Sequence, residues 1–324
     1  MNAIVRPLSV FSLLLCLLIG LCGVGSAESA DPELPAIVLN GGDSLDWPCG
    51  RPFTDPGFSA CLPDGGDASE AVITEGGVTC WRPGDYTLLY RLCGADGEEL
   101  ARAERRVRVC PVELPEAIPT HNSIYLSFDD GPDLYTDEVL DILAKYKIKA
   151  TFFVVAGKTH HLELLPRIVE EGHTLGIHAY KHDYEHLYSS PEAFFEDFIA
   201  AQEVIYRWTG QYAQVARLPG GSRSACFPRR SLRGGPAEFE QMIHNMGVRY
   251  YDWHVQPESE LKTPLGTLAC FTHPKEPYDG SIVLLHDVRR FSVLALEDMI
   301  RWALDEGYEF LPIDITTPEI HFVP

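Results

Sequence analysis

The spacing of hydrophobic residues changes about one third of the way along the chain. Before that point, short runs alternate apolar and polar side chains between turns rich in Gly, Pro and Asp. In 86–92 every second residue is Tyr or Leu, which predicts a strand with one buried face. In 103–109 the apolar Ala103, Val107 and Val109 lie opposite Glu104, Arg106 and Arg108, which predicts a second such strand. About 75 residues of this kind predict a small β-sandwich or another turn-rich β module.

After the proline-rich stretch 111–120, apolar strands alternate with amphipathic helices. Val139, Ile142, Leu143 and Tyr146 follow a helical period, and Ser190-Pro191 and Thr263-Pro264 are typical helix starts. Seven strands with a helix in each gap predict a parallel sheet in a distorted (β/α)7 barrel, closed or nearly so. The predicted strands lie near 123–128, 150–155, 174–177, 214–217, 248–252, 281–285 and 308–311.

The first residues have the pattern of a secretory signal peptide. Arg6 precedes an apolar run over 8–21, and small residues follow up to Ala27, where we expect cleavage. A retained membrane anchor is the alternative, although the run is short for a span. Lipid attachment at Cys22 is disfavoured by the bulky Leu21 before it.

These patterns predict a multidomain protein at the cell surface or outside the cell. The formal net charge of −21 argues against nucleic acid as a partner, and no protein partner is evident. The expected parts are a signal peptide (1–27), a linker (28–34), a β-sandwich (35–112), a second linker (113–120) and the barrel (121–324).

The cysteines favour disulfides in an exported protein. Two of the nine, Cys16 and Cys22, lie in the leader, and an odd number remains, so at least one is free or pairs outside the chain. No Cys-x-x-Cys spacing indicates a structural zinc site, and the connectivity stays open. The remaining cysteines are Cys49, Cys61, Cys80, Cys93, Cys110, Cys226 and Cys270.

Polar residues follow the predicted strands where a barrel carries its active site, at the carboxyl edge. Each residue alone has an ordinary explanation as a solvated turn, a polar face, a core histidine or a surface charge. His178 and His182, four residues apart, would share one side of a helical turn, and a neighbouring carboxylate would complete a metal site. The residues in question are Asp129, Asp130, His178, His182, Arg217, Asp252, His286 and Asp287.

Their order resembles the five motifs of the polysaccharide deacetylase family, carbohydrate esterase family 4, over residues 120–315. The motifs are Ser127-Phe-Asp-Asp-Gly-Pro132, His178-x-x-x-His182, Arg217-Leu-Pro-Gly-Gly221, Asp252-Trp253 and Leu284-Leu-His286.

The resemblance implies that Asp130, His178 and His182 bind one divalent metal ion and that Asp129 is the general base. Zinc is the expected metal, with cobalt or manganese as alternatives, because two imidazoles and a carboxylate accept several ions. Such an ion acidifies bound water and polarises a carbonyl.

The resemblance also implies roles for the residues that surround the base. Arg217 would orient Asp129 and pair with Asp252, and His286 would be the general acid that protonates the departing amine. Trp253 and Leu284 would line the pocket for the acetyl methyl group.

Two positions depart from the family pattern. Ala179 replaces the usual Ser or Thr beside His178, and we expect a modest effect. Gly220 replaces a frequent Tyr; its backbone N–H can still bind the oxyanion, but the groove wall should be more open.

The basic segment 222–235, which contains Cys226, would either meet acidic groups of a cell-wall polymer or form a solvated loop. A disulfide between Cys226 and Cys270 would tie the groove rim.

In the first part of the chain, Asp55-Pro56-Gly57, Arg82-Pro-Gly-Asp-Tyr86 and Asp96-Gly97 resemble the turns of bacterial Ig-like modules on surface enzymes. A spacer or adhesion role is expected for this module.

The leading hypothesis is therefore a secreted, metal-dependent N-deacetylase of a polymer that contains N-acetylglucosamine, above all peptidoglycan. Chitin oligomers or O-acetyl xylan, or a small cyclic amide, are alternative substrates of the same site. A catalytically inactive barrel that binds or adheres to the cell wall is the alternative from another class, because a fold does not guarantee activity.

Overall fold

The computed structural model describes residues 34–158, 160–224, 232, 235–258 and 261–322. The predicted signal peptide, the Cys22 lipidation site and most of the first linker lie outside these residues. So do Cys226 and most of the basic segment 222–235. Within the described part of the chain, no helix is long and apolar enough to cross a membrane.

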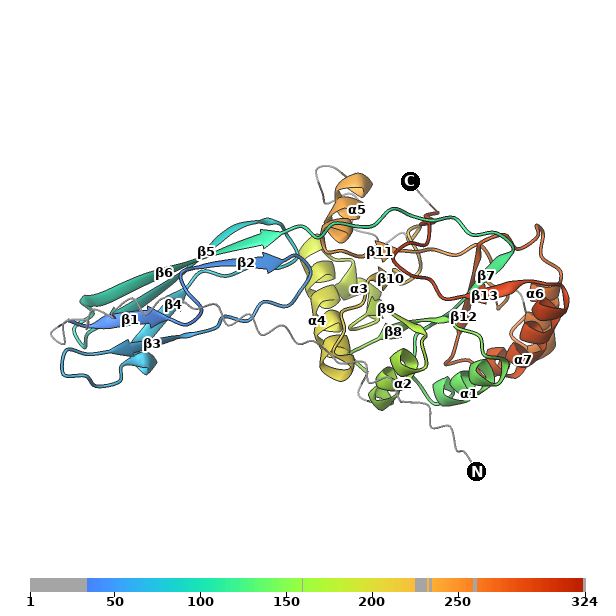
Figure 1. Ribbon diagram of the computed structural model, residues 1–324, viewed down its shortest axis with the longest axis horizontal. Helices are drawn as coiled ribbons and strands as arrows, with labels where there is room; N and C mark the ends of the chain where they lie inside the picture. Colours follow the sequence, from blue (N-terminus) through green and yellow to red (C-terminus); the bar gives the residue numbers. More distant parts are fainter. Residues whose placement is uncertain (1–33, 159, 225–231, 233–234, 259–260, 323–324) are drawn as a thin grey trace, which may run out of the picture.

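The N-terminal module, residues 34–112, is built from two small sheets (Figure 1). One has two antiparallel strands, β1 and β3, and the other has four in the order β2-β6-β5-β4. The strands are β1 Ala36–Leu39, β2 Ser44–Pro48, β3 Phe58–Cys61, β4 Val72–Glu75, β5 Gly84–Cys93 and β6 Glu99–Cys110, with a 3₁₀ turn η1 at Ser69–Ala71.

The alternation predicted for β5 and β6 is confirmed, with one exception. Leu88, Tyr90 and Leu92 are buried on one face of β5. On the inward face of β6, however, Arg105 is fully buried and is neutralised by Asp55. A buried charge needs such a partner, because desolvation would otherwise cost several kcal/mol.

The second part of the chain contains the seven predicted strands, all parallel (Figure 1). Six follow one another in the order β11-β10-β9-β8-β7-β12, and β13 pairs with the start of β7. The strands are β7 Ser123–Asp129, β8 Thr151–Val155, β9 Thr174–Ala179, β10 Val215–Ala216, β11 Arg249–Tyr250, β12 Ser281–His286 and β13 Glu309–Leu311.

The sheet does not close as a regular (β/α)7 barrel. Its two edge strands, β11 and β12, are joined through the segment that follows β11. A single parallel bridge links Val255 with Val283, and the N–H of His254 donates to Ile282. The short β10 and β11 explain the irregularity, since each contributes only two residues to the ladder.

Helices cover the outside of this sheet in every gap between strands (Figure 1). The two predicted helix starts are confirmed: Ser190 caps α4 and Thr263 caps α6, each accepting a backbone N–H in the first turn. The helices are α1 Thr136–Tyr146, α2 Leu165–Glu170, α3 Tyr184–Leu187, α4 Pro191–Thr209, α5 Gly235–Asn245, α6 Pro264–Thr272 and α7 Arg290–Asp305, with a 3₁₀ turn η2 at Leu162–Leu164.

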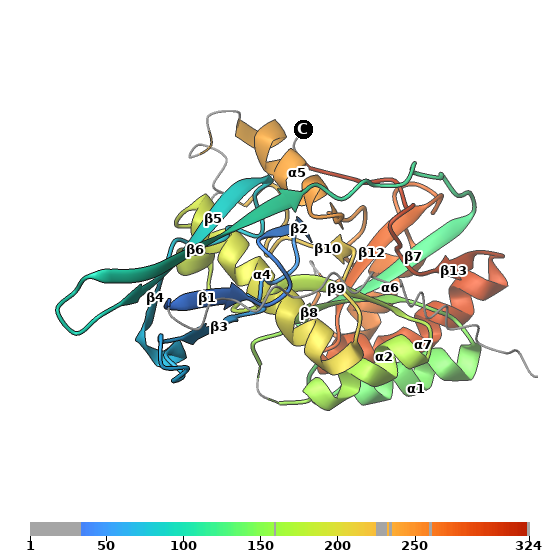
Figure 2. The same ribbon diagram turned by 60° about the vertical axis from the view of Figure 1, so that its left-hand side comes forward.

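The N-terminal module packs directly against the barrel beside α4 (Figure 2). Trp81 stacks on Phe195 of α4, with ring centroids 4.9 Å apart, and both are buried in one continuous apolar cluster. Arg51 lies over the ring of Tyr212, 5.0 Å from its centroid. The apolar core therefore extends across the boundary between the two parts.

The connection between β6 and β7 runs along the barrel (Figure 1) and is hydrogen-bonded to it. The N–H of Val112 donates to Asn245, and that of Ile118 donates to Thr316. Arg249 donates to the carbonyl of Pro115 over 2.7 Å. The segment predicted as a linker is thus attached to the barrel at Pro115 and Ile118, and Val112 just before it is attached as well.

The cysteines of the N-terminal module carry thiols rather than the expected disulfides. Cys49 and Cys80 are both buried, and burial raises the pKa of Cys49 to about 12. These residues are Cys49, Cys61, Cys80, Cys93 and Cys110.

Candidate active site

Two adjacent carboxylates stand where β7 ends. Asp129 is the last residue of the strand, is 3% exposed, and lies in register with His286 at the end of β12. Asp130 follows in a left-handed backbone conformation, with φ 73°, and is partly exposed. The two carboxylates therefore have different surroundings.

Asp130, His178 and His182 form a group with metal-ligating atoms that all lie within 4.8 Å of one another. Each histidine Nε2 is 3.5 Å from Oδ1 of Asp130. Nδ1 of His178 donates to the carbonyl of Arg217 over 2.7 Å, which leaves the Nε2 lone pair facing the carboxylate. Burial lowers the pKa of His178 even though Asp129 and Asp130 oppose the shift, so the ring is in the neutral form that binds metals.

The two histidines converge by a different route from the helical turn considered for the sequence. His178 lies within β9, and His182 lies in the turn that precedes α3. Asp183 caps this short helix by accepting the N–H groups of Glu185 and His186, which fixes the turn.

Arg217 holds Asp129 from inside the barrel. The guanidinium is fully buried, and Nη1 donates to Oδ1 of Asp129 over 2.9 Å and to the hydroxyl of Ser127 over 2.7 Å. Burial lowers the pKa of Arg217, and the Asp129 carboxylate counters this shift. Nε donates to the carbonyl of Tyr251, so the side chain is fixed at both ends.

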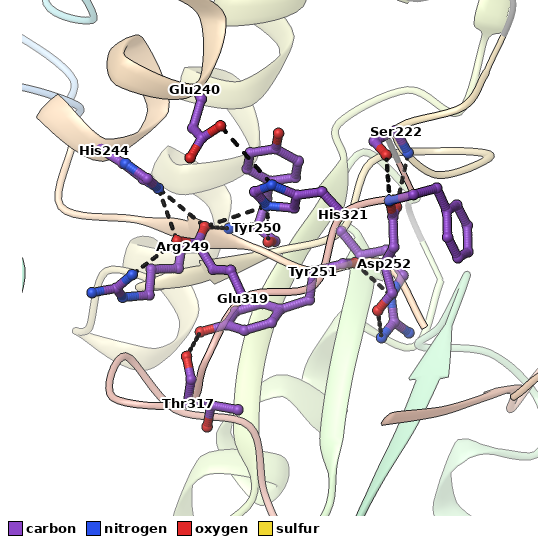
Figure 3. Close-up of polar contacts among 12 residues, drawn as sticks. Ser222, Glu240, His244, Arg249, Tyr250, Tyr251, Asp252, Thr317, Glu319 and His321 are labelled. Atoms are coloured by element: carbon purple, nitrogen blue, oxygen red, sulfur yellow. Dashed lines mark hydrogen bonds and ion pairs between the residues drawn. The ribbon is translucent and has the colours of Figure 1, made fainter. Parts of the chain in front are cut away.

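The contact of Arg217 with Asp252 is made by the main chain and differs from the expected side-chain pair. Nη2 of Arg217 is 3.3 Å from the Asp252 carbonyl oxygen. The Asp252 carboxylate instead accepts the N–H of Ser222 over 2.8 Å, the N–H of Phe322 over 2.6 Å and the Ser222 hydroxyl (Figure 3).

The C-terminal segment is held beside Asp252 by a second polar network (Figure 3). Glu319 accepts from His244 over 3.0 Å, from Arg249 over 2.8 Å and from the N–H of Tyr250 over 3.1 Å. Glu240, His244 and Glu319 have metal-ligand spacing, but Arg249 already supplies the positive charge at Glu319. This network therefore secures the end of the chain.

His286 is bound to Glu258, a residue that the sequence did not indicate. Nδ1 of His286 is 2.5 Å from Oε2 of Glu258, and Nε2 is 3.8 Å from Oδ2 of Asp130. Glu258 is 1% exposed and also accepts from Arg289 over 2.6 Å and from the Ser292 hydroxyl. Burial works against a charged His286, but Glu258 outweighs it, and the pKa of His286 is raised.

Two residues, Trp253 and Leu284, are expected to line the acetyl pocket. Trp253 packs beside the buried Tyr251 and at 4.8 Å from the ring of Phe322. Leu284 is buried in β12, two residues before His286. A pocket formed jointly by Trp253 and Leu284 stays a prediction.

Gly220 has a left-handed backbone, with φ 74°, and its surroundings differ from the open wall expected there. A Cβ at this position would lie 3.1 Å from Cε1 of Tyr184. The tyrosine thus occupies the space beside the glycine.

The chain's fold is that of a hydrolase family that acts on carbohydrates. A family model for polysaccharide deacetylase matches residues 117–232, and one for the Ig-like domain of bacterial surface proteins matches residues 37–109. Members of the deacetylase family are hydrolases that use a divalent metal ion.

The chain belongs to the polysaccharide deacetylase family, as its relatives show. It is 30% identical over 195 residues to the peptidoglycan-N-acetylmuramic acid deacetylase of Bacillus subtilis, covering 59% of this chain and 70% of that protein. It is 30% identical over 209 residues to the peptidoglycan-N-acetylglucosamine deacetylase of Listeria monocytogenes, covering 62% of this chain but only 40% of that protein.

Solved structures agree on the fold. The catalytic domain of a peptidoglycan N-acetylglucosamine deacetylase from Eubacterium rectale has a TM-score of 0.55 and 32% identity, covering 65% of this chain and 96% of that one. A polysaccharide deacetylase from Bacillus cereus has a TM-score of 0.53 and 25% identity, covering 62% of this chain and 96% of that one.

Proposed function

We propose that this chain is a secreted, metal-dependent N-deacetylase of N-acetylglucosamine-type sugars, with peptidoglycan as its polymer. The observation that carries the proposal is the group of Asp130, His178 and His182 beside Asp129 and His286. In support of the proposal, Asp129 and His286 both lie within 4 Å of a member of this group, at the carboxyl edge of the sheet.

The donor set fits a divalent ion. Asp130 offers one oxygen and the two histidines offer one nitrogen each, a combination that zinc, cobalt and manganese accept, and we favour zinc. An ion held there would polarise the acetyl carbonyl and acidify a bound water.

Asp129 would act as the general base. Its carboxylate is held by Arg217 and lies 3.9 Å from Nε2 of His178, at the edge of the ligand group. From this position it would take a proton from the water that attacks the acetyl carbon. Asp252 would contribute by holding Ser222 and Phe322 in place, because its carboxylate accepts the N–H groups of both.

His286 would act as the general acid. Glu258 favours its protonated form, and Nε2 faces the site, so the ring can pass its proton to the amide nitrogen as the C–N bond breaks. The backbone N–H of Gly220 would donate to the oxygen that gains charge, and Trp253 and Leu284 would receive the methyl group. The products are acetate and a free amino sugar.

The relatives support both the substrate class and the compartment. Those named above act on peptidoglycan, and the Ig-like match is to a domain of bacterial surface proteins. We therefore place the chain outside the cytoplasm, with its signal peptide cleaved near Ala27.

Acetate release is the direct test. The purified protein, loaded with zinc, should release acetate from peptidoglycan and from N-acetylglucosamine oligomers, and a chelator should abolish the release. Acetylated xylan, assayed in parallel, should give little acetate. Release that persists after chelation, or equally in an Asp129→Asn variant, would exclude the proposed mechanism, and preferential release from xylan would exclude the proposed substrate.

A further inference from the structure

Tyr184 occupies the rim of the candidate active site and has no role in the chemistry described above. It is the first residue of α3, two positions after His182, and 37% of the residue is exposed. Asp183 caps the helix at this point, so the direction in which the tyrosine leaves the backbone is fixed.

Aromatic contacts hold the Tyr184 ring against His182 and Tyr188. Its ring meets that of His182 edge to face, with centroids 5.0 Å apart at 77°. Behind it lies Tyr188, at 5.9 Å and 65°. Tyr188 is buried, and its hydroxyl donates to the Pro219 carbonyl over 2.7 Å. The support for Tyr184 is therefore rigid.

On its other side, Tyr184 fills the space above Gly220. A Cβ on Gly220 would lie 3.1 Å from Cε1 and 3.2 Å from the hydroxyl of Tyr184, closer than most real contacts. The backbone of Gly220 is left-handed, which also disfavours a side chain there. The glycine and the tyrosine are thus complementary in shape, and the tyrosine supplies the side chain at this part of the rim.

We propose that Tyr184 is a substrate-binding residue that packs against the sugar ring carrying the acetamide. The inference rests on the proposed function and names one contact within it. An acetamide that reaches both Asp130 and the N–H of Gly220 must pass beside the Tyr184 ring, because that ring lies between His182 and Gly220.

The chemistry of the two surfaces matches. A pyranose ring has an apolar C–H face bordered by hydroxyl groups, and tyrosine has an apolar ring with a polar tip. The partly exposed ring can cover the C–H face. Tyr184 does not belong to the metal-binding group, so its contribution is to binding.

The test compares Tyr184→Ala and Tyr184→Phe with the zinc-loaded wild type on N-acetylglucosamine oligomers. Tyr184→Ala should raise KM about tenfold and change kcat less than twofold, because the contact between the ring and the sugar is lost. Tyr184→Phe should recover most of the affinity. Tyr206→Ala, a change at an exposed tyrosine near the end of α4, is the matched control and should leave both constants unchanged.

Binding without turnover gives a second measurement. In the Asp129→Asn background, calorimetry with the oligomer should show the same tenfold loss of affinity when Tyr184→Ala is added. A zinc content below one per chain in Tyr184→Ala, or a fall in kcat with unchanged KM, would overturn the proposal in favour of structural support for His182. Unchanged KM and affinity would also overturn it. If the wild type releases no acetate from any polymer, the proposed function fails instead.

Discussion

The pair formed by Glu258 and His286 leads to the sharpest prediction. Glu258→Gln keeps the size of the side chain but removes the negative charge that lies 2.5 Å from Nδ1 of His286. Because Glu258 is what raises the pKa of His286 against the effect of burial, that pKa should fall in the variant. A general acid works only while protonated, so the alkaline limb of the pH profile of kcat/KM should move to lower pH.

The size of the effect follows from the strength of the contact. A hydrogen bond to a charged group is worth about 1.5–3 kcal/mol, which corresponds to a loss of roughly 10- to 150-fold in kcat/KM at pH values above neutrality. The loss should shrink as the pH is lowered and His286 becomes protonated again. Arg289 and Ser292 also lose a charged acceptor, so thermal unfolding must confirm that the variant is folded.

The assay is acetate release from N-acetylglucosamine oligomers across the pH range, with Glu306→Gln, a change at an exposed carboxylate, as the control. An unchanged alkaline limb in a folded, metal-loaded Glu258→Gln protein would refute the reasoning that Glu258 maintains the acid. An equal loss at every pH would assign Glu258 to structural support alone.

Three further predictions concern the metal-binding group, the core and the junction between the two parts. Asp130→Ala should lose zinc by elemental analysis, whereas Asp129→Asn should retain it and lose turnover by about 10²- to 10⁴-fold; zinc retained by the first variant would contradict the ligand set. Burial lowers the pKa of His173 to about 4, so this imidazole takes up a proton in the unfolded state before it does so in the folded state. Between pH 7 and pH 4 the free energy of unfolding of the wild type should therefore fall by ~3 kcal/mol more than that of His173→Gln, measured by urea titration. Equal pH dependence would refute it. Trp81→Ala should lower the unfolding free energy by ~3 kcal/mol, whereas the exposed Trp208→Ala should cost under ~0.5 kcal/mol, and equal effects would contradict the shared core.

The parts of the site that lie at strand ends could be predicted from the sequence. Asp129 ends β7 and His286 ends β12, and the parallel sheet brings such ends together whatever the details of packing. The helix starts at Ser190 and Thr263 could be predicted for a similar reason, because a capping side chain and the following proline act locally.

Residues that act across loops could not be predicted in this way. Glu258 lies in an irregular segment after β11, where no periodicity relates it to His286, 28 positions later. The available signal was that a buried histidine needs a hydrogen-bond acceptor, which would have directed attention to the carboxylates of the chain. Arg105 is the reverse case. Its position in the alternation of β6 predicts a side chain that faces inward, whereas its charge predicts one that faces solvent. The fold was needed to identify Asp55 as the partner that allows it to be buried.

The hydrogen-bonded connection between the module and the barrel bears on how the enzyme would reach its substrate. A flexible tether lets a catalytic domain explore a volume around its anchor, with a local concentration set by tether length. Here Val112, Pro115 and Ile118 are bound to the barrel, and Trp81 is packed into it. These contacts connect the site directly to the module, so the proposed enzyme would reach substrate near the place where the module is held and would not explore a tether's volume around it.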